Sequence, residues 1–156
     1  MNPHPLIAII PAAGLSRRMG QPKLLLPWRG STVIAHLVGE LRAAGVTQIF
    51  VVLRTGDEAL LAAVVAAQAI PLQPPVDPPD MRSSVEYGLQ KVVESWNFPS
   101  TDATASDSVT FPLGGWLLIP ADHPIVSHTT IVALQQAWRS EERQILIPTY
   151  AGKRGH

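Results

Sequence analysis

Short apolar runs alternate with amphipathic stretches along most of the chain. Residues 6–10 (LIAII), 48–53 (QIFVVL) and 116–121 (WLLIPA) are continuous apolar runs, which are typical of strands buried on both faces of a parallel sheet. Two shorter runs, at 69–72 and 144–147, predict further strands. The pattern therefore predicts five strands.

Helical patterns separate these runs. Residues 31–44 begin with Ser and Thr, place apolar residues three and four apart, and end before Gly45, which predicts an amphipathic helix with a cap at each end. Strands that alternate with helices indicate an α/β fold, in which a mainly parallel sheet carries helices on both faces in a three-layer, Rossmann-like arrangement. The other predicted helices run from Asp57 to about residue 68, over 81–93, and from Ser127 or Thr129 to about residue 139.

Residues 95–115 (SWNFPSTDATASDSVTFPLGG) are polar and show no periodicity. Loops of this length are unusual inside a compact domain, so the segment is predicted to be a mobile surface insertion. It is not a domain boundary, because the strand after it is needed by the sheet before it. With 156 residues and 46% hydrophobic content, the chain can bury a core of its own, and we expect one domain over 1–156.

Composition excludes several partners. Twelve basic and twelve acidic residues cancel, so no overall field would attract nucleic acid or an anionic membrane. The chain has no cysteine, which excludes disulfides and thiolate metal sites. The N-terminal apolar run is far shorter than the ~18 residues of a spanning helix and follows no basic leader. The expected location is therefore the cytoplasm.

The loop after the first predicted strand, residues 11–23 (PAAGLSRRMGQPK), combines small residues with cations. In a parallel α/β sheet this loop lies at the edge where ligands bind. The small residues from Ala12 to Gly14 would let backbone N–H groups approach phosphate oxygens, and Arg18 and Lys23 would neutralise their charge. The alternative is a plain glycine turn with solvated cations.

The spacing does not fit two common phosphate loops. A Walker A loop requires a hydroxyl residue directly after its lysine, whereas Leu24 follows Lys23. A dinucleotide fingerprint requires GxGxxG, whereas Ser16 stands at the second glycine position. The sequence therefore does not favour a hydride-transfer enzyme.

The loop does match the signature AAGxSxRMGxxK, and the chain also contains SSVEYGL at 83–89, PADHP at 120–124 and GKRGH at 152–156. In these motifs it resembles the MobA-like nucleotidyltransferases, and AAGLSRRMGQPKLLLPW is most similar to their molybdenum cofactor cytidylyltransferase branch. The resemblance implies a fold of the nucleotide-diphospho-sugar transferase type. It also implies transfer of CMP from CTP to the phosphate of molybdopterin, with release of pyrophosphate.

The resemblance suggests roles for individual residues. Asp122 directly follows a predicted strand, and the family places its Mg²⁺ aspartate at this point; without the family, a turn cap before Pro124 would be an equal reading. Arg18 and Lys23 would steady the departing phosphates. Ser84 could be an ordinary serine of a helix start, and Arg54 a solvent-facing cation. Nucleotide contacts are nevertheless expected from Pro11, Ala12, Ala13, Gly14, Ser16, Arg18, Lys23, Arg54, Thr55 and Ser84.

The choice of CTP over GTP rests on AAG and QPK in the loop, since relatives that use GTP tend to read AGG with Asp before the lysine. The family pattern continues beyond His156 with about a quarter of a domain and a second metal aspartate. We therefore expect a C-terminally truncated domain with an open sheet edge that favours self-association.

Two other functions stay open. The chain could be a non-catalytic nucleotide- or cofactor-binding module that delivers molybdopterin to a molybdoenzyme. It could also be a nucleotidyltransferase that uses GTP or another phosphorylated acceptor.

Overall fold

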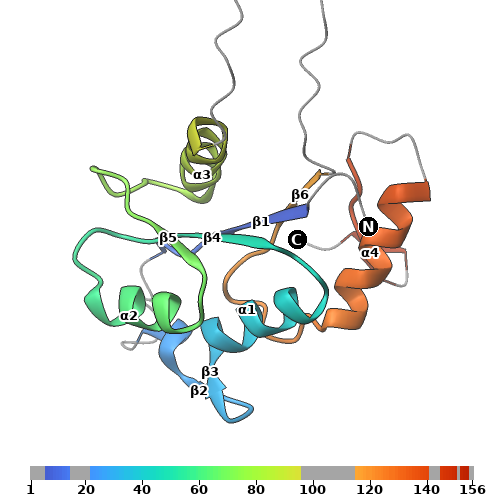
Figure 1. Ribbon diagram of the computed structural model, residues 1–156, viewed down its shortest axis with the longest axis horizontal. Helices are drawn as coiled ribbons and strands as arrows, with labels where there is room; N and C mark the ends of the chain where they lie inside the picture. The colour runs from blue at the N-terminus through green and yellow to red at the C-terminus, as the bar shows by residue number, and fades with distance from the viewer. Residues whose placement is uncertain (1–5, 15–21, 96–114, 141–144, 151, 155–156) are drawn as a thin grey trace, which may run out of the picture.

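A four-stranded parallel sheet forms the centre of the molecule, in the order β5-β4-β1-β6 (Figure 1). The computed structural model describes residues 6–14, 22–95, 115–140, 145–150 and 152–154. The strands are β1 (Leu6–Pro11), β4 (Gln48–Val52), β5 (Ile70–Leu72) and β6 (Gly115–Leu118).

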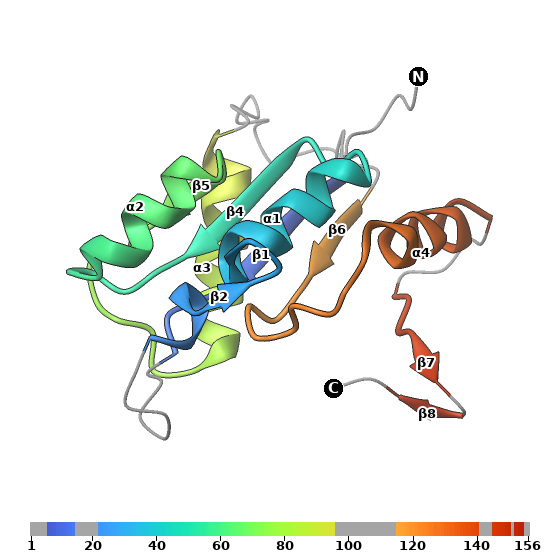
Figure 2. The same cartoon turned by 90° about the horizontal axis from the view of Figure 1, so that it is seen from below.

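Helices cover both faces of this sheet. One face carries α1 (Val33–Ala43), α2 (Glu58–Ala66) and α4 (His128–Ser140), and the other carries α3 (Met81–Ser95) (Figures 1 and 2). The predicted α/β fold is therefore confirmed.

The structure also contains several short elements. These are η1 (Lys23–Leu25), the hairpin of β2 (Pro27–Trp28) and β3 (Ser31–Thr32), and the pair β7 (Thr149–Tyr150) and β8 (Lys153–Arg154).

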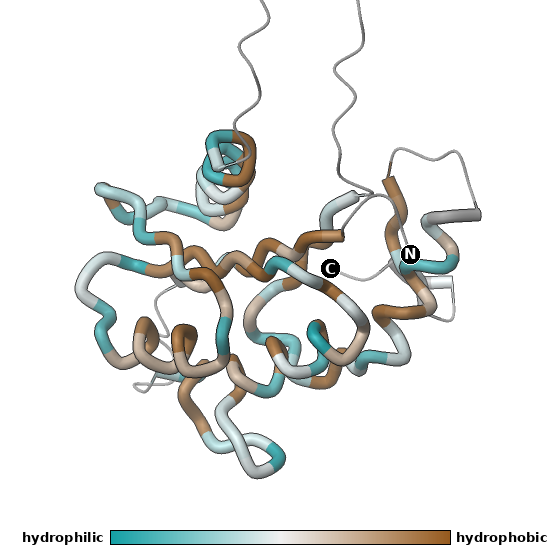
Figure 3. Tube along the Cα trace, viewed as in Figure 1, coloured by the Kyte–Doolittle hydropathy of each residue, from teal (hydrophilic) through white to brown (hydrophobic). Residues whose placement is uncertain are grey.

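The apolar residues of β1 pack into two hydrophobic clusters, one on each face of the sheet, because successive side chains of a strand point to opposite faces. Ala8 and Ile10 belong to the larger cluster beneath α1, whereas Ile7 packs with Phe50 and Val92 beneath α3. These strand residues are buried, and the central strands form a hydrophobic band through the molecule (Figure 3). Burial on both faces explains why the run is continuous rather than alternating.

A glycine lets α3 lie close to the sheet. A Cβ built on Gly88 would come 2.9 Å from Cγ2 of Ile9 and 3.4 Å from Cγ2 of Val52. Real Cβ atoms do not approach so closely without displacing a neighbour. Gly88 therefore sets the distance between α3 and the sheet, and with it the position of the helix start at Met81.

The structure corrects several predicted boundaries. Residues 145–147 do not form the expected strand, because a strand needs a hydrogen-bonded neighbour and the described residues provide none there. The first helix begins at Val33, since Ser31 and Thr32 pair in the hairpin and Thr32 caps the helix. β6 ends at Leu118. The predicted insertion falls almost wholly on 96–114, outside the described residues.

A bilayer-spanning helix is absent from the part of the chain that the structure describes.

Candidate nucleotide-binding site

The loops that follow three neighbouring parallel strands, β4, β1 and β6, all begin at the carboxyl-end edge of the sheet. Backbone hydrogen bonds continue just past the strands, from Ala12 N to the Val52 carbonyl (2.8 Å) and from Ile119 N to the Ile9 carbonyl (3.2 Å). The loops that follow therefore start side by side, although the chain order separates them widely. This is the edge at which parallel α/β sheets bind ligands.

A cavity of about 660 Å³ opens at this edge. Its volume lies in the range of small-molecule and cofactor sites. Most of the residues expected to contact a nucleotide meet here. It is lined by Pro11, Ala12, Ala13, Gly14, Lys23, Leu24, Arg54, Asp77, Pro78, Pro79, Asp80, Met81, Ser84, Pro120, Ala121 and Asp122.

Lys23 and Asp122 form an ion pair in the lining of the cavity. Nζ of Lys23 donates to Oδ2 of Asp122 at 2.7 Å, and the side chains are 37% and 48% exposed. Lys23 opens the short helix η1, and Asp122 lies in the turn after β6. The hydrogen bond from Lys23 is the main reason why the pKa of Asp122 lies below its usual value. The cavity thus holds an ionised carboxylate beside a cation.

Arg54 and Asp77 form a second pair in the lining of the same cavity. Nε and one terminal nitrogen of Arg54 donate to Oδ2 of Asp77 at 2.9 and 2.5 Å, and the Thr55 backbone N–H donates to Oδ1 at 3.2 Å. The Arg54 side chain is 30% exposed and held by this carboxylate, so it is not a freely solvated cation. Asp77 lies in a proline-rich segment without periodicity, where sequence reasoning did not identify it.

Hydrogen bonds extend this second pair into a network. Thr55 Oγ1 donates to the Pro74 carbonyl (2.9 Å), Gln73 Nε2 donates to the Arg54 carbonyl (3.1 Å), and the Tyr87 hydroxyl donates to the Gln73 carbonyl (3.3 Å). The network joins the end of β4 to the segment before α3 and to α3 itself. It therefore fixes one wall of the cavity.

Asp80 caps the start of α3. Its Oδ1 accepts from the backbone N–H of Ser83 (2.7 Å) and from the Ser83 hydroxyl (2.8 Å), and these bonds lower the pKa of Asp80. Ser84 is only 2% exposed, and its hydroxyl donates to the Asp80 carbonyl at 3.1 Å. With that proton engaged, Ser84 can offer a ligand an acceptor lone pair rather than a donor. An aspartate three residues before Ser83 is the sequence signal that could have identified this cap.

Eleven residues were predicted to form the site, as ten nucleotide contacts and the metal ligand Asp122, and the structure brings eight of them together at the cavity. Thr55 does not line the cavity but binds Asp77 beside it. Ser16 and Arg18 lie outside the described residues. The other predicted residues, Pro11, Ala12, Ala13, Gly14, Lys23, Arg54, Ser84 and Asp122, all line the cavity.

The donor set suits a hard divalent cation that arrives with its own oxygen ligands. Among the described residues there is no group of three His, Cys, Asp or Glu side chains that would hold a metal alone. Mg²⁺ is commonly bound by one or two carboxylates together with substrate phosphates and water. The Asp122 carboxylate, half exposed at the cavity, fits that kind of site.

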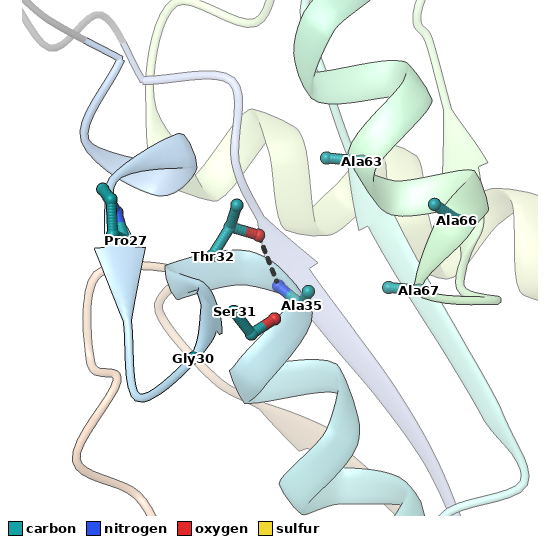
Figure 4. Close-up of a pocket in the computed structure, with 8 residues that line it drawn as sticks. All are labelled: Pro27, Gly30, Ser31, Thr32, Ala35, Ala63, Ala66 and Ala67. Carbon is teal, nitrogen blue, oxygen red and sulfur yellow. Dashed lines mark hydrogen bonds between the residues drawn. The ribbon is translucent and has the colours of Figure 1, made fainter.

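A second hollow lies between the hairpin, α1 and α2 (Figure 4). Small side chains dominate it, including Ala35, Ala63 and Ala67, and it contains no charged residue. The Thr32 hydroxyl is already used, since it accepts from the backbone N–H of Ala35 at 3.3 Å. This hollow therefore offers no cation to neutralise a phosphate.

Comparison with known proteins shows the family to which the chain belongs. The family model described as "MobA-like NTP transferase domain" matches residues 8–156. A "Probable molybdenum cofactor guanylyltransferase" of Rhodopirellula baltica is 31% identical over 150 residues, which cover 93% of this chain and 61% of that protein. A protein of the same name from Bacillus cereus is 23% identical over 146 residues, covering 94% of this chain and 62% of the relative.

Solved structures show the same fold. The crystal structure of Rv0371c from Mycobacterium tuberculosis superposes with a TM-score of 0.73 at 26% identity, covering 97% of this chain and 69% of that one. A structure described as Rv0371C in complex with manganese gives a TM-score of 0.63 at 22% identity, covering 97% and 68%. The present chain spans about three fifths of the length of the curated relatives it matches.

The names of these relatives overturn one prediction. Both curated relatives are guanylyltransferases, so the prediction of CTP as the nucleotide is wrong. The physical reason is that the prediction rested on residues 12–14 and 21–23, in a loop expected to contact the phosphates, and all nucleoside triphosphates share the same phosphates. The match over residues 8–156, together with the shared fold, establishes that the chain belongs to the MobA-like NTP transferase domain family.

Proposed function

We propose that this chain is the nucleotide-binding part of a molybdenum cofactor guanylyltransferase. A phosphate oxygen of molybdopterin would attack the α-phosphorus of GTP, the bond from that phosphorus to the β-phosphate oxygen would break, and pyrophosphate would leave. The observation that carries the proposal is the meeting of Lys23, Asp122 and the small residues 12–14 at one cavity. The names of the two curated relatives support the nucleotide and the acceptor.

The protein's part in this reaction is positioning and charge neutralisation, since phosphoryl chemistry asks little covalent work of its residues. Backbone N–H groups of Ala13 and Gly14 would approach the phosphates, because these side chains are small or absent. Lys23, with Arg18, would neutralise the charge that develops on pyrophosphate as it leaves. Removal of either cation should therefore act on turnover more than on folding.

Asp122 would hold the divalent cation, which we take to be Mg²⁺. Such an ion, when bound, stabilises the negative charge of the phosphate oxygens. The manganese complex of a protein with the same fold supports a divalent ion in this fold. Asp122 is suited to the role because it is ionised at neutral pH, half exposed and adjacent to the phosphate loop.

The part of the cavity lined by Arg54, Asp77 and Asp80 would receive the base and ribose. It carries the carboxylates of Asp77 and Asp80. Guanine presents neighbouring N–H donors on its Watson–Crick edge, whereas cytosine presents one amino donor beside acceptors. Asp77 accepts three hydrogen bonds, and a carboxylate has about four acceptor sites. Asp77 therefore keeps about one acceptor site for a ligand, and the choice of GTP rests on the names of the two curated relatives.

Pyrophosphate release tests the proposal. The protein is incubated with each nucleoside triphosphate, Mg²⁺ and molybdopterin, and binding of each nucleotide to this chain is measured separately. We expect GTP to bind and to release pyrophosphate when the acceptor is present. Nucleotide binding without release would instead favour a module that passes the cofactor to a molybdoenzyme, and release with another phosphorylated acceptor alone would favour a different transferase. The expected setting is the cytoplasm.

A further inference from the structure

The proposed function gives Lys23 and Asp122 different ligands, yet the two side chains bind each other here. Lys23 would hold phosphate and Asp122 would hold a divalent cation. In the structure, Nζ of Lys23 donates to Oδ2 of Asp122 at 2.7 Å, across 99 positions of the chain. Both residues line the same cavity. Each side chain therefore competes with the other's ligand.

We propose that Lys23 and Asp122 form a latch that suppresses divalent-cation binding until a triphosphate draws Lys23 away. The latch makes nucleotide and cation bind cooperatively, so that the carboxylate is released for the cation only when the nucleotide is present. This inference rests on the proposed role of Asp122 as the metal ligand.

Charge explains the suppression. The ammonium group of Lys23 occupies one carboxylate oxygen and adds a positive charge within a few ångströms of the place where a dication would bind, and like charges at such a distance repel. A triphosphate carries several negative charges and can take over the ammonium group. The cation then meets an uncompensated carboxylate next to phosphate oxygens.

Exposure explains why the latch can open. With side chains 37% and 48% exposed, the pair is partly solvated, and ion pairs of this kind are worth little in stability. A ligand can therefore exchange with either partner at small cost. By linkage, whatever the cation gains from the departure of Lys23, the nucleotide gains equally from the presence of the cation.

The chain contains a matched control pair. Lys91 and Glu94 on α3 form an ion pair at 2.5 Å, with the same side-chain exposures of 37% and 48%. This pair does not line the cavity. The change Lys91→Gln removes the same charge from an equally exposed pair, and so controls for net charge.

The test is a titration with Mn²⁺ alone, without nucleotide, followed by electron paramagnetic resonance of the free ion. We expect Lys23→Gln to bind Mn²⁺ about threefold to tenfold more tightly than the wild type, because the competing charge is gone. Lys23→Arg, which keeps the charge, should restore weak binding, and Lys91→Gln should stay within about twofold of the wild type. Unchanged thermal melting would show that each variant is folded.

Two results would overturn the latch in distinguishable ways. Equal or weaker Mn²⁺ binding in Lys23→Gln, with binding abolished in Asp122→Asn, would leave the metal site intact and remove the competition. Unchanged Mn²⁺ binding in Asp122→Asn would instead show that Asp122 is not the metal ligand, and the proposed metal role would fail together with the latch.

Discussion

Two acid–base pairs stand at the same edge of the sheet and differ in how firmly they are held. One hydrogen bond joins Lys23 to Asp122. Two join Arg54 to Asp77, and the Thr55 backbone N–H adds a third to the same carboxylate. The second pair is also tied to α3, through Gln73 and Tyr87. The same charges can therefore form an exchangeable pair at Asp122 and a fixed wall at Asp77.

The largest effect should come from the exchangeable pair. Lys23→Ala should lower turnover by about 10²–10³-fold, as removal of one preorganised charge-stabilising group does in other enzymes. The unfolding free energy should change by less than about 1 kcal/mol, because the pair is partly solvated. Pyrophosphate release and denaturant unfolding measure the two quantities. Near-normal turnover would contradict the role of Lys23.

The position of the wall can be tested through Gly88. Gly88→Ala should destabilise the protein by about 1–3 kcal/mol, because the new methyl group must displace Ile9 in a packed core. Gly39, in α1, is the matched control, since a Cβ there meets nothing within 4 Å. Gly39→Ala should stabilise the helix by roughly 0.5–1 kcal/mol. Equal effects of the two changes in urea unfolding would show that α3 does not depend on this close contact.

Mutation of the fixed pair, Arg54 and Asp77, should lower the free energy of unfolding. Asp77→Asn removes the counter-charge of Arg54 and weakens three hydrogen bonds, so we expect a loss of about 1–2 kcal/mol. The same variant should reduce the preference for GTP over other nucleotides if the wall contacts the base. Chemical denaturation and competitive nucleotide binding provide the two measurements. A stability equal to that of the wild type would place this pair in the same class as Lys23 and Asp122.

The smallest expected effect is on the pH dependence of stability that comes from Asp122, the carboxylate of the exchangeable pair. Lys23 lowers the pKa of Asp122 in the folded protein, so this carboxylate contributes stability above its unfolded pKa and loses it as pH falls through the lower folded value, below about pH 4. In Lys23→Gln the pKa should rise towards its usual value, and the acid dependence of unfolding should become slightly shallower. Carboxyl NMR titration of Asp122 measures the shift. An unchanged pKa would show that the lysine is not its cause.

Much of the fold was predictable because its signals are local. Continuous apolar runs predicted β1, β4, β5 and β6, and amphipathic spacing, capping residues and an alanine-rich composition predicted the four longer helices. Residues 145–147 show the limit of this reasoning. A short apolar run such as Ile145 to Ile147 is typical of a strand. A strand also needs a neighbour to pair with, and the sequence pattern does not supply one.

For the candidate site too, some features could be predicted from the sequence and others could not. The residue types of the phosphate loop and the place of Asp122 after a strand could be read directly, because parallel strands deliver their loops to one edge. The sequence by itself therefore determined the layer order and the chemistry available at that edge. The contact of Asp77 with Arg54 and the pairing of Lys23 with Asp122 were decided only by the tertiary structure. Each of these contacts joins residues far apart in the chain, and the partners meet because of how the helices and strands pack.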